Sequence, residues 1–229
     1  EVDVFQTYCP IPKEEVEQVS HLILMNLVPF MLEKDIKNFG WAVSELQKVG
    51  FNKLEHSLDA SYLPTMKAIE EAGGELNRDF SVKDAVFEEA NEAKTFTYTA
   101  WLDRADVIID FCKLKTHGMM AMSGAAKNMF GVITGTAKPE YHYRFPEPAD
   151  FADMIVDLDE YFKPRLSIVD GVVGMEGNGP TAGSPRPIGV LLASESPHAA
   201  DLIGAAIIGL KTEEVPTLVA AIRRGLIPD

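Results

Sequence analysis

Apolar runs that alternate with helical patterns predict a layered α/β protein. The run at residues 107–109 is β-branched throughout, which suits a strand buried on both faces of a mostly parallel sheet. Further strands are predicted at residues 166–169 and 188–193, and a half-exposed strand at 95–99. Helices are predicted at residues 123–130, 151–162, 197–210 and from 216 onward. This alternation favours an α/β domain with a mostly parallel sheet.

The first 60 residues have a different pattern, which predicts a small helical segment. One helix is expected from Lys13 and a second from Asp35, because residues 36–49 carry a single apolar stripe at helical spacing. Residues 1–12 contain two prolines and are expected to form a loop. The predicted organisation is therefore a helical segment, residues 1–60, followed by an α/β domain, residues 61–229, which begins with a short helix at 64–72.

Two long connections are predicted within the α/β domain. One spans residues 135–148 and carries Lys138 and His142, and the other is the glycine-rich stretch 171–183. Loops of this length in compact domains are often functional. The alternative for the second stretch is an ordinary connection rich in turns.

Polar side chains gather directly after the first apolar run, at Lys113, Lys115, Thr116 and His117. Open α/β sheets bind ligands in the crevice outside the carboxyl ends of their strands, so this edge is the expected place for a site. Two lysines and a histidine there point to an anionic ligand, since ammonium groups supply both charge and hydrogen-bond donors. The alternative is a solvated loop whose lysines point into water.

Four more polar residues complete the predicted ligand-binding set. Lys127 and Asn128 interrupt the small-residue helix, where they either face the same crevice or mark the exposed side of the helix. Glu176 and Asn178 lie in the glycine-rich stretch, where backbone amides approach an anion easily, although no nucleotide-binding pattern is present. We expect Lys127 to hold the anion, and Glu176 and Asn178 to orient it.

The expected catalytic residues are His117, Lys115 and Asp170. Asp170 directly follows the strand at 166–169. The imidazole of His117 has an ordinary pKa near neutrality, so it suits proton transfer. A mixed metal site built from His117, His142, Glu140 and Asp170 lacks any tight ligand spacing, and no metal is predicted.

Charge and apolar run length exclude several classes of protein. The net charge of −14 argues against a nucleic-acid partner or an anionic membrane surface. No stretch approaches the roughly 20 apolar residues that span a bilayer, and no signal peptide is recognised, so a cytoplasmic location is expected. The methionines between 119 and 129 are predicted to fill the core.

Cysteine content restricts the cofactors. Only Cys9 and Cys112 are present, whereas a ferredoxin-type cluster needs four cysteine ligands, so this chain alone cannot hold an iron–sulfur cluster. The cofactor is left unknown. Cys112 is interpreted as a small buried hydrophobe, with a reactive thiol as the alternative.

Two motifs resemble the DUF362 family: Lys-Leu-Lys-Thr-His-Gly at 113–118 and Gly-Ala-Ala-Lys-Asn-Met-Phe-Gly at 124–131. The resemblance continues through Ile-Val-Asp-Gly at 168–171, the stretch 174–180 and Gly-Ser-Pro-Arg at 183–186, and covers about residues 64–229. Members of this family often carry a ferredoxin-like iron–sulfur module. The resemblance therefore implies an anaerobic redox process in which a separate iron–sulfur protein or domain is the partner.

Residues 1–58 carry a second resemblance. The segments Tyr-Cys-Pro-Ile-Pro at 8–12, Leu-Met-Asn-Leu-Val-Pro at 24–29 and Glu-Lys-Asp-Ile-Lys-Asn-Phe-Gly at 33–40 are similar to the C-terminal part of β-ribofuranosylaminobenzene 5′-phosphate synthase, of the GHMP-kinase superfamily. The phosphate-binding loop of such kinases has no counterpart in the sequence.

These observations lead to one main hypothesis and two alternatives. The main hypothesis is a DUF362-like domain that binds a small anionic ligand at the strand ends. The first alternative is a non-catalytic interaction module whose acidic surface docks a partner. The second is a phosphotransfer protein of the pterin pathway, which would bind ATP.

Overall fold

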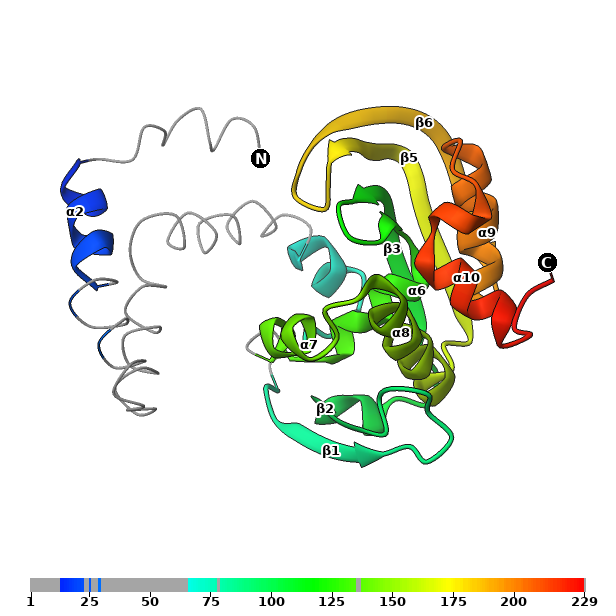
Figure 1. Ribbon diagram of the computed structural model, residues 1–229, viewed down its shortest axis with the longest axis horizontal. Helices are drawn as coiled ribbons and strands as arrows, with labels where there is room; N and C mark the ends of the chain where they lie inside the picture. The colour runs from blue at the N-terminus through cyan, green and yellow to red at the C-terminus, as the bar shows by residue number, and fades with distance from the viewer. Residues whose placement is uncertain are drawn as a thin grey trace. The chain divides into compact units, whose positions relative to one another are not determined.

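The computed structural model describes residues 13–22, 25, 29, 66–77, 79–134 and 137–228 (Figure 1). The chain divides into two units, residues 1–77 and 78–229. In the first unit, helix α2 (Lys13–Leu22) confirms the helix predicted from Lys13, and residues 66–71 confirm the short helix predicted at 64–72. The predicted loop at 1–12 and the predicted helix from Asp35 lie outside the described residues.

The second unit is built on a mixed sheet of four strands in the order β4-β3-β5-β6. Its strands are β3 (Ile109–His117), β4 (Ala121–Ser123), β5 (Leu166–Asn178) and β6 (Ala182–Ser194). The central pair, β3 and β5, is parallel, and the outer strands β4 and β6 each pair antiparallel. With helices packed on this sheet, the predicted α/β class is confirmed.

Strand β3 is longer than predicted and is buried on one face only. Cys112 and Leu114 are buried, whereas Ile109 and Phe111 are 59% and 65% exposed, and Val107 precedes the strand. The prediction of a short strand buried on both faces was therefore wrong. The β-branched run marked the start of a strand whose buried positions are the alternate residues that follow it. As a result, the polar residues 113–117 lie within the strand, and not beyond its end.

The predicted loop at 171–183 is also wrong, because these residues form the far half of the β5–β6 hairpin (Figure 1). The predicted strands at 166–169 and 188–193 are the near ends of the same two strands. The glycines allow close packing of backbone. A Cβ on Gly179 would lie 1.9 Å from the carbonyl oxygen of Thr116, and one on Gly174 would lie 2.9 Å from that of Leu114. The glycines that suggested a loop are thus needed where this hairpin lies against β3.

Helices cover the buried face of the sheet. The short helix α6 (Ala125–Asn128), continued by the 3-10 helix η3 (Met129–Val132), packs on β3 and on α8 (Pro148–Phe162). Helix α9 (Pro197–Ile207) lies on β5 and β6, and α10 (Pro216–Arg223) packs on α8 and α9 after the 3-10 turn η4 (Thr212–Glu214) (Figure 1). These helices were predicted. Helix α7 (Lys138–Arg144) was not, and it corrects the loop expected at 135–148.

A two-stranded hairpin precedes the sheet. It joins β1 (Val82–Val86), which the sequence analysis missed, to the predicted strand β2 (Thr95–Thr99), and a 3-10 helix η2 (Ala100–Arg104) follows. Phe96 and Tyr98 of β2 form edge-to-face ring contacts with Tyr161 and Phe162 at the end of α8. The hairpin is therefore fixed to α8 by an aromatic cluster.

The core confirms two assignments of individual residues. Met120, Met122 and Met129 are buried in the apolar clusters, as core filler should be. Cys112 is 8% exposed, and burial raises the pKa of its thiol, so it is a small buried hydrophobe and not a reactive thiolate.

Candidate functional site

Five cationic or imidazole side chains gather near the end of β3. They are Lys115 and His117 on β3, Lys127 on α6, and Lys138 and His142 on α7. Within the described part of the chain, none of them forms an ion pair with a carboxylate. Each lies at an intermediate or exposed position, so ligands in solvent can reach the group. We call these five residues the cationic cluster.

Two aromatic rings bring three members of the cationic cluster together. The Nζ atom of Lys127 lies 5.4 Å from the ring centroid of Phe130 and 5.5 Å from that of Phe151. Lys138 Nζ lies 5.9 Å from the same Phe130 ring, and the His142 ring stacks on Phe151 with centroids 4.6 Å apart. The faces of the rings attract the positive charges and hold them close to one another without neutralising them.

Burial is the main cause of the lowered pKa values in the cluster, and neighbouring like charges add to it. Burial, together with the charges of Lys115 and Lys138, lowers the pKa of Lys127 to about 8. Burial likewise lowers the pKa of His117 to about 4, with contributions from Lys127, His142 and Lys115. No carboxylate offsets either shift, and an anionic ligand would supply that counter-charge.

The backbone fixes the tautomer of His117. Its Nδ1 atom accepts hydrogen bonds from the backbone N–H groups of Met119 at 3.1 Å and Met120 at 3.2 Å. Since the neutral ring carries one proton, that proton lies on Nε2. His117 therefore presents an N–H donor at neutral pH, and its role in proton transfer stays a prediction.

A buried carboxylate positions Lys127. The side chain of Asp201 on α9 accepts hydrogen bonds from the backbone N–H groups of Ala125 at 2.6 Å and Ala126 at 3.1 Å, in the first turn of α6. A Cβ on Gly124 would lie 2.1 Å from the Asp201 carboxylate, so this contact requires glycine. Although α6 is short, its N-terminus is anchored, and the direction of Lys127 is set.

Lys113 and Asp170 lie outside the cationic cluster. They are partners across β3 and β5, and Lys113 Nζ donates to a carboxylate oxygen of Asp170. The second oxygen of Asp170 accepts from the backbone N–H of Val172 at 2.9 Å. This contact with Lys113 lowers the pKa of Asp170. Both residues are therefore engaged in a partly exposed ion pair.

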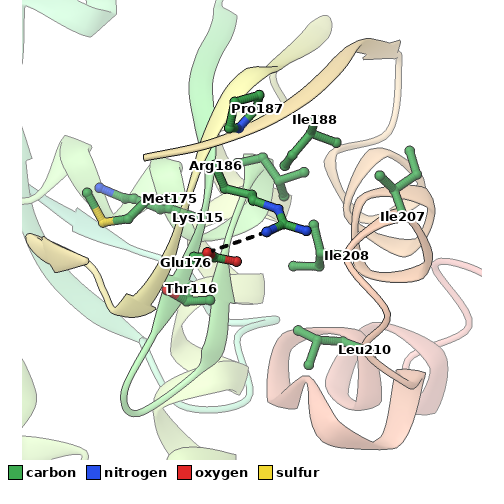
Figure 2. A pocket seen from close by; sticks show the side chains of 11 residues that line it. Lys115, Thr116, Met175, Glu176, Arg186, Pro187, Ile188, Ile207, Ile208 and Leu210 are labelled. Atoms are coloured by element: carbon green, nitrogen blue, oxygen red, sulfur yellow. Dashed lines mark ion pairs between the residues drawn. The ribbon is translucent and has the colours of Figure 1, made fainter. Parts of the chain in front are cut away.

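A cavity of about 410 Å³ brings three other predicted residues near one another. Lys115, Thr116 and Glu176 line it, together with Arg186 and an apolar wall. The wall consists of Ile188 of β6 and, from α9 and the turn after it, Ile207, Ile208 and Leu210. Figure 2 shows the Glu176 carboxylate and the Arg186 guanidinium facing each other, 3.7 Å apart, while the Lys115 side chain extends away from this pair. Lys115 thus belongs both to the cavity wall and to the cationic cluster.

The remaining predicted residues have structural contacts or are exposed. Thr116 Oγ1 donates to the carbonyl of Gly177 at 2.9 Å. The side-chain amide of Asn128 donates to Asp110 at 2.6 Å and to the carbonyl of Phe111 at 3.3 Å, which ties α6 to β3. Asn178 is exposed at the end of β5.

Lys138 and His142 were not among the predicted binding residues, because the sequence analysis assigned them to a loop. A signal was available. Pro139 suits the first turn of a helix, and a spacing of four residues places Lys138 and His142 on one helical face. Recognising that helix would have added both residues to the candidate site.

Two features are absent from the described residues. No group of three or more histidine, cysteine, aspartate or glutamate side chains in that part of the chain is arranged to hold a metal ion. Nor does any helix there have the length and apolar character needed to cross a membrane.

The fold and the cluster define an α/β protein with a mixed sheet and an uncompensated cationic surface at one end of its central strand. The family model "Domain of unknown function (DUF362)" matches residues 42–206. The chain belongs to this family, as its motifs predicted, although the match begins before the predicted residue 64 and ends before the predicted residue 229.

Individual relatives match parts of the chain. The thylakoid-associated protein sll1697 of Synechocystis is 39% identical over 125 residues, which are 54% of this chain and 39% of that protein. Beta-ribofuranosylphenol 5'-phosphate synthase is 47% identical over 60 residues in Methanocaldococcus jannaschii and 50% identical over 58 residues in Methanothermobacter thermautotrophicus. These matches, each 18% of the synthase, confirm a local likeness to such enzymes over about a quarter of the chain. No solved structure matches the chain.

Proposed function

We propose that the protein binds a small anion at the cationic cluster. The observation that carries this proposal is that five side chains able to bear positive charge converge without a carboxylate partner among the described residues, in a chain whose net charge is −14. Holding the three lysine charges together costs free energy, which an anion would recover. A phosphate or a carboxylate is the ligand chemistry that lysine and a neutral imidazole donor suit.

Each member of the cluster has a distinct role in the proposed complex. Lys115, Lys127 and Lys138 supply charge and donors, and His117 donates a hydrogen bond through Nε2. His142, stacked on Phe151, closes the aromatic side of the site. The proposal replaces Lys113, Asn128 and Asp170 with Lys138 and His142, because those three side chains already bind protein groups.

The experiment is a calorimetric titration of the purified chain with inorganic phosphate, which measures the affinity. Lys115→Ala should weaken binding about tenfold or more, as expected when a charge-assisted hydrogen bond is lost, without lowering the melting temperature. Lys113→Ala is the matched control and should bind as the unchanged protein does. Phosphate affinity that is equal in both variants would refute this location of the site.

An iron–sulfur partner in an anaerobic redox process remains part of the proposal. It rests on the family resemblance, and the chain spans 39% or less of the length of the curated relatives described above. The test is purification without oxygen from cells that make the chain with an affinity tag. Stoichiometric iron and sulfide in the purified sample would support the partner, and their absence would count against it.

Two alternatives have their own tests. An interaction module predicts a protein that co-purifies and no stabilisation of the chain by phosphate or carboxylates. A phosphotransfer protein of the pterin pathway, supported by the likeness to the two synthases, predicts ATP binding. Measuring the melting temperature with ATP and with phosphate separates these alternatives, since only the anion site responds to phosphate alone.

A further inference from the structure

The cavity of about 410 Å³ between β6 and the end of α9 is a second candidate site, and its volume is typical of small-molecule sites. We propose that it binds a free aliphatic α-amino acid, such as leucine. The cavity shares only Lys115 with the cationic cluster, and the side chain of Lys115 extends away from the Glu176–Arg186 pair (Figure 2). The inference therefore goes beyond the proposed anion site and does not depend on it.

The β5–β6 hairpin places a cation and an anion side by side at this cavity. Arg186 lies opposite Gly174 and Glu176 lies opposite Ser184, so the two charged side chains are diagonal neighbours on one face of the hairpin. Arg186 Nη1 and Glu176 Oε1 are 3.7 Å apart, which is too far for a hydrogen bond. Neither side chain forms a hydrogen bond elsewhere in the described part of the chain, and they are 62% and 54% exposed. Both charges are therefore available to a ligand.

The opposite wall of the cavity is aliphatic and is fixed by the end of α9. The backbone N–H of Leu210 donates to the carbonyl of Ala205 at 2.9 Å, and that of Gly209 donates to the carbonyl of Ala206 at 3.2 Å. With Gly209 at a φ of +79°, these bonds form a Schellman motif, which turns the chain and brings Leu210 to the cavity. The aliphatic side chains of the wall are Ile188, Ile207, Ile208 and Leu210. No aromatic ring is among the described lining residues, so the wall suits an aliphatic side chain.

A free α-amino acid carries charges that match both members of the pair. Its carboxylate would accept hydrogen bonds from the Arg186 guanidinium, and its ammonium group would donate to the Glu176 carboxylate. An aliphatic side chain on the same carbon would then lie against the isoleucine wall and lose its contact with water. A fatty acid or an alkylamine would leave one of the two protein charges unmatched. Either end of a peptide likewise carries only one of the two charges.

The test is a calorimetric titration of the full chain with leucine and three analogues. Inorganic phosphate is present throughout, so that carboxylates do not report on the cationic cluster. Leucine should bind, whereas isocaproate, which lacks the ammonium group, and isoamylamine, which lacks the carboxylate, should each bind about tenfold or more weakly. Glycine, which lacks the side chain, should also bind about tenfold or more weakly, because the apolar burial is lost.

Two variants locate the site. Arg186→Gln should weaken leucine binding about tenfold or more. Its matched control is Arg165→Gln, since Arg165 pairs with Glu195 at the same 3.7 Å separation but does not line the cavity. Glu176→Gln should weaken the binding of leucine and leave that of isocaproate unchanged. Neither Arg186 nor Glu176 belongs to the cationic cluster, so both variants should bind phosphate as the unchanged protein does.

The outcomes separate the two proposals. Absence of leucine binding, an analogue lacking one charge that binds as tightly as leucine, or equal leucine affinities in Arg186→Gln and Arg165→Gln would overturn the amino-acid site. Leucine binding without phosphate binding would overturn the proposed function and leave the amino-acid site standing. If Arg186→Gln fails to fold, the comparison of leucine with its analogues in the unchanged protein decides the question.

Discussion

Two clusters of charge in this protein are organised in opposite ways. Asp157 of α8 is fully buried and accepts hydrogen bonds from the backbone N–H groups of Asn91, Glu92 and Ala93 at 2.7 to 2.9 Å. Its carboxylate also binds Arg224 at 2.8 Å. In the cationic cluster, Lys127, Lys138 and His142 share two aromatic rings, and no member of the cluster has such a partner in the described part of the chain.

The comparison teaches how to separate structural charge from functional charge. Asp157 itself has complementary groups on all sides, and its contacts join the β1–β2 connection to α8 and to Arg224, which follows α10. Around Lys127 no complementary group lies among the described residues, although Lys113, on the same strand as Lys115, has one in Asp170. Charge that is satisfied within the protein stabilises the fold, whereas charge left without a counterpart indicates a ligand.

The largest effect is predicted for a substitution that removes the contacts of Asp157. Asp157→Ala leaves three backbone N–H groups and Arg224 without their acceptor, so the free energy of unfolding should fall by about 3 to 5 kcal/mol. Urea denaturation measures this loss. Asp157→Asn, which keeps one carbonyl oxygen, should lose less. A loss below about 1 kcal/mol for the alanine variant would show that the carboxylate does not hold the two segments together.

The next prediction concerns pH and the unpaired cluster. Because the pKa of Lys127 falls from 10.5 in the unfolded chain to about 8 in the folded one, the unfolded chain binds more protons between these pH values. Stability should therefore rise with pH across that window, in the absence of ligand. Urea midpoints at several pH values test this, with Lys127→Met as the variant in which the rise should diminish. An unchanged rise in that variant would assign it to another group.

Anion binding should show the opposite dependence on pH. The protonated ammonium of Lys127 holds the anion, so phosphate affinity should decrease as pH rises through about 8. Calorimetric titrations at pH 7 and pH 9 would measure the change, with Lys127→Met as the insensitive control. Affinity that increases with pH would contradict a role for this ammonium group.

The smallest effect is predicted for a substitution that removes the exposed ion pair between Lys113 and Asp170. Lys113→Ala removes the contact with Asp170, whose side chain and that of Lys113 are 25% and 46% exposed. Exposed ion pairs contribute little, so the free energy of unfolding should change by less than about 1 kcal/mol. A larger loss, measured by urea denaturation, would show that this pair stabilises the sheet in the way that Asp157 stabilises α8.

Much of the fold was predictable because local patterns and tertiary packing agree there. The apolar stripe of α8 and the alternation in β2 both gave the observed elements. In the β5–β6 hairpin, the local sequence pattern and the tertiary packing disagree. Glycine is a poor strand former in isolation, yet Gly174 and Gly179 are required where backbone lies against β3. The need for glycine at these positions comes from the neighbouring strand β3. The local sequence of the hairpin does not reveal which strand lies beside it.

The candidate site was predictable in part for a similar reason. Lys115, His117 and Lys127 were found from the motifs near the central strand. Lys113 was included because the strand was taken to end before it, whereas it lies within β3 opposite Asp170. Lys138 and His142 lie on another element, α7. The residue spacing along β3 and α6 does not show that α7 packs beside them, so the sequence did not place these two residues at the site.

The most direct test of the account compares phosphate affinity in Lys127→Met and Lys113→Met. Both variants lose one lysine charge, so any effect of net charge is the same in the two. The account predicts that Lys127→Met loses about tenfold or more in affinity while Lys113→Met stays close to the unchanged protein. Equal affinities in the two variants, or no phosphate binding by the unchanged protein, would contradict the claim that unpaired charge marks the site.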